Sequence, residues 1–417
     1  MVGGGIFAVL GLAVMFAGGG TPIAFAFAGV IALVTSYSYA RLSLTYPCEA
    51  GTVRFLNQAF GPGFFTGSAN VLLWLGYIVT LSLYAYAFGS YGSSFFPAAA
   101  QPFWKHVFLN GMVVGMTVLN LVGVRAVARA EIWIVGLKSA ILLLFIGIGF
   151  WTVKAGSLAP ATWAGTGQLI AGGMVIFVAY EGFQLIANTA TDIKDPEKNL
   201  PRSYYTAVGF VIFLYIAISV VAVGNLSLSK IAAAEDYALA AAAEPVLGNV
   251  GFALVVIAAL ASTSSALNAT LYGVTRLSYN LAVDGELPEA LERKVWNRPV
   301  AGLLISAGLT LVIANGFNLT DISVMGSSGF LIIFGTVNAA NLKLRKKTKS
   351  RSWIPTLGVI LCAGAFVTLI YEITRIAPKT IIVLALLIVL AVAIEFIYRY
   401  FKGREIKLPE LKSAVKR

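Results

Sequence analysis

The chain has 417 residues, of which 59% are hydrophobic and 12% are charged, and its mean hydropathy is +0.85. About a quarter of the residues of a soluble domain are charged, so this composition excludes a water-soluble fold and indicates a protein whose solvent is lipid. One histidine, His106, and two distant cysteines, Cys48 and Cys362, exclude a zinc site, an iron–sulfur cluster and a disulfide framework. We therefore expect no metal and no other cofactor.

Apolar segments long enough to cross a membrane recur along the whole chain. A membrane helix needs about 20 mainly apolar residues, because the hydrocarbon core is about 30 Å thick. Short polar turns marked by glycine and proline separate the segments, and their continuous apolar character predicts helices rather than strands. The expected spans cover residues 22–40, 64–90, 107–123, 132–152, 166–190, 203–224, 248–275, 300–317, 322–341, 354–373 and 380–398.

The segment ahead of these spans, MVGGGIFAVLGLAVMF, is apolar but supplies only the second half of a crossing. It has no basic start, and three glycines stand where the apolar run of a signal peptide would begin, which disfavours a signal peptide. We therefore expect eleven full spans and a first helix that lacks its N-terminal half.

Lysine and arginine are concentrated in alternate loops. If residues 22–40 run towards the cytoplasm, the loops on that side hold 24 basic residues, including the run KLRKKTKSR, and the opposite loops hold five. Cytoplasmic loops of membrane proteins carry such an excess. The pattern predicts a multi-pass protein of the cell membrane with a cytoplasmic C-terminus. Topology thus accounts for the net charge of +12 better than anionic-lipid contact does, and no nucleic-acid partner is expected.

Lys138 is the one basic residue that lies neither in a loop nor at the end of an expected helix. It follows Glu131 by seven residues, so it lies about 10 Å inside its helix. A lysine at that depth costs about 2.5–3.5 kcal/mol unless it is paired, solvated or neutral. It can snorkel to the interface or bond a neighbouring helix, but burial also favours release of its proton at physiological pH. We favour a functional role.

Glu181 is the matching acid, near the centre of the segment MVIFVAYEGFQLIANTA. A structural hydrogen bond between helices and a functional role fit this residue equally well. Polar residues and Gly182 interrupt the apolar run, which predicts a helix whose backbone opens towards a cavity. The polar residues are Tyr180, Glu181, Gln184, Asn188, Thr189 and Thr191.

Two glycine-interrupted segments, residues 3–5 and 180–182, stand at corresponding places in the two halves of the chain. Transporters built from inverted repeats place their substrate site where two such helices meet at the membrane midplane. Close helix packing is the other use of glycine in membranes, but three consecutive glycines favour unwinding. Freed amides favour a carboxylate and freed carbonyls favour an ammonium group. The pattern therefore predicts a midplane site for a zwitterion.

Four motifs give the chain a resemblance to the amino acid–polyamine–organocation (APC) transporters over nearly its whole length. They are VGGGIF, YPCEAGT, FVAYEGFQLIAN with DIKDPEKNLPRS behind it, and TRLSYNLAVDGELPE, in the family's order and spacing. The chain most resembles the archaeal proton-coupled, broad-specificity amino acid transporters, which carry a lysine at the position of Lys138. The resemblance implies an all-α polytopic membrane protein of about 12 helices with a 5+5 inverted-repeat, leucine-transporter-like fold. Its parts would be residues 1–152, 166–341, 354–400 and a cytoplasmic tail at 401–417.

The resemblance also implies roles for particular residues. The unwound first helix would hold the substrate carboxylate, the sixth helix would hold the amino group with carbonyls and surround it with side chains, and Lys138 with two hydroxyls would replace a sodium site. The residues matched are Gly3, Gly4, Gly5 and Ile6 for the carboxylate; Phe177, Val178 and Ala179 for the amino group; Tyr180, Glu181, Gly182 and Gln184 for the side-chain pocket; and Lys138, Ser264 and Ser265 for proton coupling.

These expectations describe a proton-coupled amino acid symporter that works by alternating access. An amino acid or polyamine exchanger and a sodium-coupled symporter are the alternatives. Relatives with an acidic residue in place of Gln184 use it in exchange or selectivity, so an exchanger of cationic substrates is disfavoured. No continuous polar face or repeated filter indicates a channel. An intramembrane enzyme is disfavoured because His106, expected in an external loop, has no partner for catalysis. Neither the amino acid carried nor the oligomeric state follows from the sequence.

Overall fold

The computed structural model describes residues 1–122, 127–288, 291 and 300–402, and within this part the chain is built from helices. The helices that form the bundle are α2 (Thr21–Thr45), α4 (Phe64–Ser93), α5 (Gln101–Val122), α6 (Val127–Gly149), α8 (Pro196–Asn225), α10 (Ala238–Val283), α12 (Leu319–Lys343), α14 (Trp353–Ile376) and α15 (Pro378–Lys402). Shorter helices are α1 (Gly5–Ala17), α3 (Gly51–Phe60), α7 (Thr166–Val175), α9 (Leu228–Ala233), α11 (Val300–Gly316) and α13 (Arg345–Thr348).

The expected spans and the helices correspond closely. In the described part of the chain, nine helices are long and apolar enough to cross a membrane, and a pair bent between α7 and residues 177–189 makes a tenth. Two more expected crossings, α1 with 13 residues and α11 with 17, are apolar but shorter. Helices suit this environment because each pairs its backbone polar groups internally. The prediction of an all-α polytopic membrane protein is confirmed.

One placement from the sequence is wrong. His106 lies inside α5 rather than in an external loop, and its Nδ1 atom is 2.7 Å from Oδ1 of Asn315 on α11. The helix begins at Gln101, six residues before the apolar run, because polar residues of its first turns bond to neighbouring helices. Lys105, for example, donates to Tyr86 at 2.9 Å and pairs with Asp236 at 3.4 Å.

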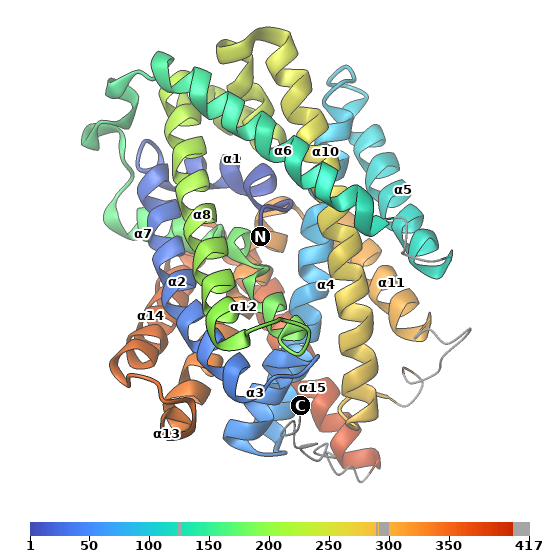
Figure 1. The fold of residues 1–417 in the computed structure, drawn as a ribbon. Helices are drawn as coiled ribbons and strands as arrows, with labels where there is room; N and C mark the ends of the chain where they lie inside the picture. The colour runs from blue at the N-terminus through green and yellow to red at the C-terminus, as the bar shows by residue number, and fades with distance from the viewer. Residues whose placement is uncertain (123–126, 289–290, 292–299, 403–417) are drawn as a thin grey trace.

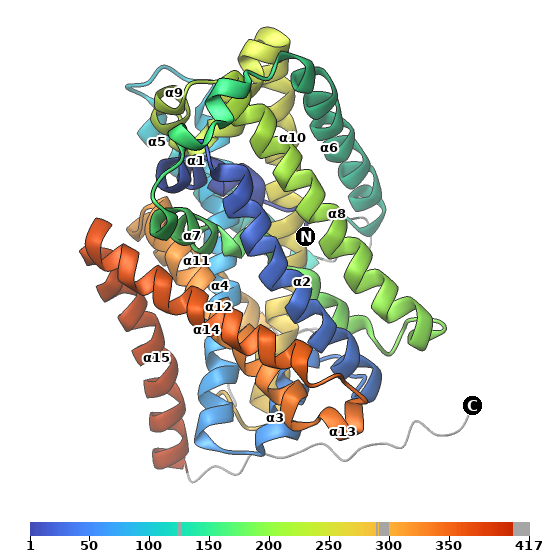
Figure 2. The same cartoon turned by 90° about the vertical axis from the view of Figure 1, so that its left-hand side faces the viewer.

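The bundle is organised around α4. In the most apolar continuous stretch of 18 residues, 94% of the residues are buried in α4, against 28% in α6, α14 and α15. Figure 1 shows α4 within the bundle and α6 crossing its outer face, and the turned view in Figure 2 shows α14 and α15 on another outer face. The N-terminus lies in the middle of the molecule (Figure 1). The segment Met1–Gly4 is therefore close to the helices that surround the interior.

An aromatic cluster fills the interior beside the interrupted segment that follows α7. The ring of Phe183 lies 5.5 Å from Tyr39 of α2 and 5.0 Å from Phe334 of α12, and Phe177 also contacts Phe334, at 5.8 Å. Edge-to-face pairs at such distances are favourable beyond their burial alone. The cluster supports residues 177–183 from the side of α2 and α12.

Polar side chains tie α12 to α2. Asn338 accepts a hydrogen bond from Ser38 at 2.7 Å and donates to Thr35 at 3.0 Å. One turn further along, Asn341 donates to Ser38 at 3.1 Å. All four side chains are buried. Hydrogen bonds between membrane helices contribute about 0.6 kcal/mol on average, so this network stabilises one relative position of α2 and α12.

We expect Thr35→Val to lower the free energy of unfolding by about 1 kcal/mol, because it keeps the shape of the side chain but leaves the amide of Asn338 without this acceptor. Thr374→Val is the matched control, since its hydroxyl bonds only the Ile370 carbonyl of its own helix and is exposed. Thermal unfolding of the purified protein in detergent measures both variants. Equal midpoints for the two would contradict the assigned role of the network.

Candidate functional site

The sixth expected helix is interrupted where the sequence predicts. Helix α7 ends at Val175, a 3₁₀ turn covers Phe177–Tyr180, and a second 3₁₀ segment runs from Phe183 to Thr189. Between them Glu181 is extended and Gly182 has a φ of +119°, a left-handed conformation that favours glycine. The two parts of the span are bent by 47°. The backbone of this span therefore leaves several polar groups outside regular helical bonds.

Side chains from other helices pair with the groups that the interruption frees. Ser327 of α12 accepts a hydrogen bond from the Val178 amide at 2.9 Å and donates to the Val175 carbonyl at 2.8 Å. Tyr180 donates to the Phe25 carbonyl of α2 at 2.8 Å. Such partners are what allow an irregular backbone to exist at membrane depth.

The first interrupted segment lies directly against this second one. Helix α1 begins at Gly5, and its N-cap residue, Gly4, makes no side-chain capping bond. A Cβ atom at Gly5 would lie 2.6 Å from the Cα atom of Ala179, so the two backbones touch at this point. The hydroxyl of Tyr215 on α8 is 3.2 Å from the carbonyl oxygens of both Met1 and Ala179, and so links the two segments.

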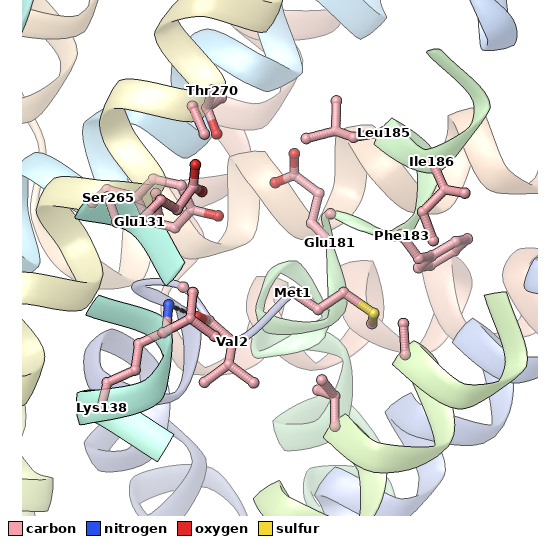
Figure 3. Close-up of a pocket in the computed structure, with 18 of the residues that line it drawn as sticks. Met1, Val2, Glu131, Lys138, Glu181, Phe183, Leu185, Ile186, Ser265 and Thr270 are labelled. Carbon is pink, nitrogen blue, oxygen red and sulfur yellow. Dashed lines mark hydrogen bonds between the residues drawn. The ribbon is translucent and has the colours of Figure 1, made fainter. Parts of the chain in front are cut away.

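A cavity of about 400 Å³, here called the central cavity, opens between these segments and helices α4, α6, α8 and α10. Figure 3 shows Lys138 with its nitrogen beside Val2, and Glu181 on a different part of the wall from Glu131 and Ser265. Apolar residues, among them Leu185, Ile186 and Phe210, form much of the remaining lining. Lys138 and the carboxyl groups of Glu131 and Glu181 thus border a largely apolar space.

Glu181 is held in place by two donors. Its carboxylate accepts hydrogen bonds from the Thr80 hydroxyl of α4 and from the Gln184 amide, the latter at 3.1 Å. The oxygen of Gln184 accepts the Gly182 amide at 2.7 Å. Gln184 therefore bonds both residues of the break, and its role in the structure is to fix the direction of the Glu181 side chain.

Lys138 is buried, with 4% of its surface exposed, and its ammonium group donates to the carbonyl of Val2, next to Gly3. The lysine therefore bonds the unwound backbone that precedes α1 and does not snorkel to the interface. A carbonyl that has no helical partner is a suitable acceptor for a buried ammonium group.

The hydroxyls of α10 are divided between two directions. Ser265 lines the central cavity together with Lys138, but Ser264 donates to Leu260 of its own helix at 2.6 Å and lies 3.7 Å from the sulfur of Met112. Ser262, three residues before Ser265 and on the same face, donates to the Gly3 carbonyl at 2.8 Å. The structure therefore brings Ser262 and Ser265, and not Ser264, to the start of α1.

The residues that the sequence places at the site fall into two groups in the structure. Those that line the central cavity are Gly3, Lys138, Glu181, Gly182 and Ser265. Those that stand behind its wall, in the first turn of α1, in the interrupted segment or on the other side of α10, are Gly4, Gly5, Ile6, Phe177, Val178, Ala179, Tyr180, Gln184 and Ser264.

The sequence analysis missed several side chains that hold the site together: Thr80, Tyr84, Tyr215, Ser262 and Ser327. Thr80 and Tyr84 are four residues apart and share a helix face, a spacing that marks a polar stripe on an apolar helix. Tyr84 lies so close to α1 that a Cβ atom at Gly3 would be 3.6 Å from its hydroxyl oxygen. For Tyr215 and Ser327 no local signal exists, because their partners are distant backbone carbonyls.

This fold and site define a polytopic membrane transporter in which two interrupted helices meet at a cavity in the bundle. The chain matches the model of the amino acid permease family over residues 1–399 and belongs to that family. It is a transporter and not an enzyme.

Relatives with similar sequences cover most of the chain. An uncharacterized protein of Methanocaldococcus jannaschii is 36% identical over 89% of this chain and 86% of its own length. The inner membrane transport protein YbaT of Escherichia coli is 33% identical over 89% of this chain and 87% of its own length. The methylthioribose transporter of Bacillus subtilis is 27% identical over 89% of this chain and 85% of its own length.

We expect Gly5→Ala to abolish substrate uptake, because the new methyl group would meet the Ala179 backbone and force the two interrupted segments apart. Gly136→Ala is the control, since a Cβ atom there meets no atom within 4 Å. Uptake into proteoliposomes measures the effect, with circular dichroism to verify that both variants fold. Wild-type uptake by Gly5→Ala would show that the contact is not required.

We expect Ser327→Ala to destabilise the protein by about 1–3 kcal/mol, because it leaves the Val178 amide and the Val175 carbonyl without their partner. The adjacent Ser328→Ala is a matched control: Ser328 is equally buried on α12, and its hydroxyl has no hydrogen-bond partner in the described structure. Thermal unfolding in detergent separates the two, and a loss of stability as large in Ser328→Ala would refute this explanation.

Proposed function

We propose that this permease is a proton-coupled amino acid symporter of the cell membrane, with Lys138 as the proton carrier. The observation that carries the proposal is the hydrogen bond from Lys138 of α6 to the Val2 carbonyl beside the unwound start of α1. It joins a titratable group to the backbone next to the substrate site. A transporter that couples two fluxes needs such a link between the ion site and the substrate site.

The proposed binding mode follows from the polar groups at the interruption. Gly4, Gly5 and Ile6 stand behind the wall of the central cavity in this structure. In the substrate-bound arrangement that we propose, their amides at the start of α1 turn to the cavity and receive the substrate carboxylate, since a helix N-terminus favours an anion. The carbonyls of Phe177, Val178 and Ala179 receive the ammonium group, and the side chain of the substrate extends towards Glu181 and the apolar wall. The family description, amino acid permease, supports this substrate class.

Lys138 acts in this mechanism by changing charge. In its protonated state the ammonium group holds the Val2 carbonyl and supplies positive charge beside Ser265. Once the proton leaves, that charge-assisted bond is weakened, so α6 is released from the start of α1 and the bundle can change the side on which the cavity opens. Alternating access then carries a proton and an amino acid together.

The arrangement in the membrane is part of the proposal. Residues 1–152 and 166–341 form the two inverted repeats, and helices within 354–400 follow. The tail at 401–417, which from residue 403 on lies outside the described residues, is proposed to face the cytoplasm. The excess of lysine and arginine in the loops on that side supports this orientation.

A sodium-coupled symporter is the second candidate. Ser262 bonds the Gly3 carbonyl of the first segment, Ser265 lines the central cavity with Val2 and Gly3, and such oxygens are the ligands that a hard cation prefers. The ammonium group of Lys138 occupies the same place, however, and its charge opposes the entry of a second cation. This observation favours the proton over sodium.

The test is uptake of labelled amino acids into proteoliposomes with an imposed pH gradient, acidic outside. Wild-type protein is expected to accumulate substrate, since protonation on the acidic side loads Lys138. Lys138→Ala is expected to lose proton-driven accumulation but to keep exchange of labelled for unlabelled substrate. Lys198→Ala, an exposed lysine at the start of α8, is the control and is expected to behave as wild type.

Three outcomes contradict parts of the proposal. Accumulation by Lys138→Ala with an undiminished dependence on pH rules out this lysine as the carrier. Accumulation that requires a sodium gradient supports the sodium symporter. Exchange without net accumulation under any gradient makes the protein an exchanger.

A further inference from the structure

A groove on the outer surface of the bundle, formed by α12 and α14 together with the junction of α3 and α4, has a volume of about 350 Å³. It is called the α12–α14 groove below. Its walls are apolar, from Phe60 and Phe65 at one side to Leu331 on α12 and Phe366 on α14. The hydroxyl of Thr336 in its lining is already bonded to the Ile332 carbonyl. The groove therefore offers an apolar ligand a surface without unsatisfied hydrogen bonds.

Small residues give the groove its depth and its length. Gly335 and Ala339 on α12 and Ala363 on α14 line the groove, where larger side chains would fill the space. Along α12 the lining runs from Leu331 to Ala339, about 12 Å at 1.5 Å per residue. One leaflet of the hydrocarbon core is about 15 Å thick. A single acyl chain matches these dimensions.

A fixed positive charge stands at the end of the groove. The ammonium group of Lys343, the last residue of α12, lies 5.2 Å from the centre of the Phe60 ring, and Phe60 itself lines the groove. Arg345, Lys346 and Lys347 follow in α13 and are exposed. In the described structure none of these four side chains forms a salt bridge with a carboxylate. Their charge is available to an external anion.

The basic segment is anchored to the bundle. Thr348 and Ser350 both donate to Asn341 at 2.9 Å, and the Arg351 amide donates to the Tyr37 hydroxyl of α2 at 2.9 Å. Trp353 begins α14 with 62% of its surface exposed, as is common for tryptophan at the level of the lipid headgroups. Figure 2 shows α13 at the lower ends of α12 and α14. The segment that carries the cations is thus anchored at the ends of two apolar helices, beside an exposed tryptophan.

We propose that the α12–α14 groove binds one anionic phospholipid, with an acyl chain along the groove and the phosphate paired with Lys343. Membrane topology explains an excess of basic residues on one side, but it requires neither an anchored segment nor an ammonium group at the mouth of an apolar groove. A neutral lipid or a helix of a second copy would fill the groove without using that charge. The joint presence of both features favours the anionic lipid.

The binding experiment uses the full-length protein in nanodiscs that contain phosphatidylcholine and phosphatidylglycerol in equal amounts, with a photoreactive acyl chain on either lipid in turn. Phosphatidylglycerol is expected to label peptides of α12 and α14 in preference to phosphatidylcholine. Lys343→Gln should lower its labelling about fivefold, the value of one basic residue near a charged surface. Ala363→Phe should lower labelling by both lipids, because it fills the groove.

Matched controls keep the test decisive. Lys198→Gln removes an exposed charge from the start of α8, and Ala385→Phe adds a ring to an exposed position of α15 outside the groove. Both are expected to leave the labelling of α12 and α14 unchanged. The proposal is overturned by equal labelling from both lipids, by an equal loss in Lys198→Gln, or by crosslinks that show a second copy of the chain in the groove.

Discussion

The whole site depends on one constraint: a polar backbone group within a membrane must find a partner inside the protein. Two spans of this chain break their helical bonding, and side chains from distant helices pair several of the freed groups. Ser327 bridges the ends of the break after α7, and Ser262 and Lys138 bond the carbonyls ahead of α1. The bundle therefore exists in its present form because distant helices supply these donors and acceptors.

The same constraint connects the two halves of the chain. Because Gly5 has no side chain, the start of α1 touches the backbone at Ala179, and partners from α8, α10 and α12 surround that contact. A displacement of any of these helices would leave a backbone group without its bond. In the proposed mechanism the change of access is thus a concerted exchange of bonds around one point, whereas helices that face lipid, such as α15, contribute little to it.

Much of this architecture follows from sequence because hydropathy and glycine are local signals. The lengths of the apolar segments predict the spans, and Gly182 predicts the break in the sixth span without any knowledge of the side chains that bond it. The orientation of α10 did not follow, since the rotation of a helix about its axis depends on packing, and so Ser262 was overlooked in favour of Ser264. The prediction that His106 lies in a loop is wrong because the polar first turns of a helix can form when side chains of neighbouring helices, such as Asn315, form hydrogen bonds with them. Serines and tyrosines that bond remote carbonyls leave no trace in local pattern.

The hydroxyl of Tyr215 has a single hydrogen, yet two carbonyl oxygens lie at the same distance from it. A hydroxyl donates to one acceptor at a time and rotates to suit its surroundings, so at any moment one of the two carbonyls lacks the bond from Tyr215. In the proposed binding mode, an ammonium group that arrives at Ala179 needs to break no bond, because the hydrogen can turn towards Met1. In this binding mode the substrate therefore needs to cause little reorganisation of the backbone around Ala179.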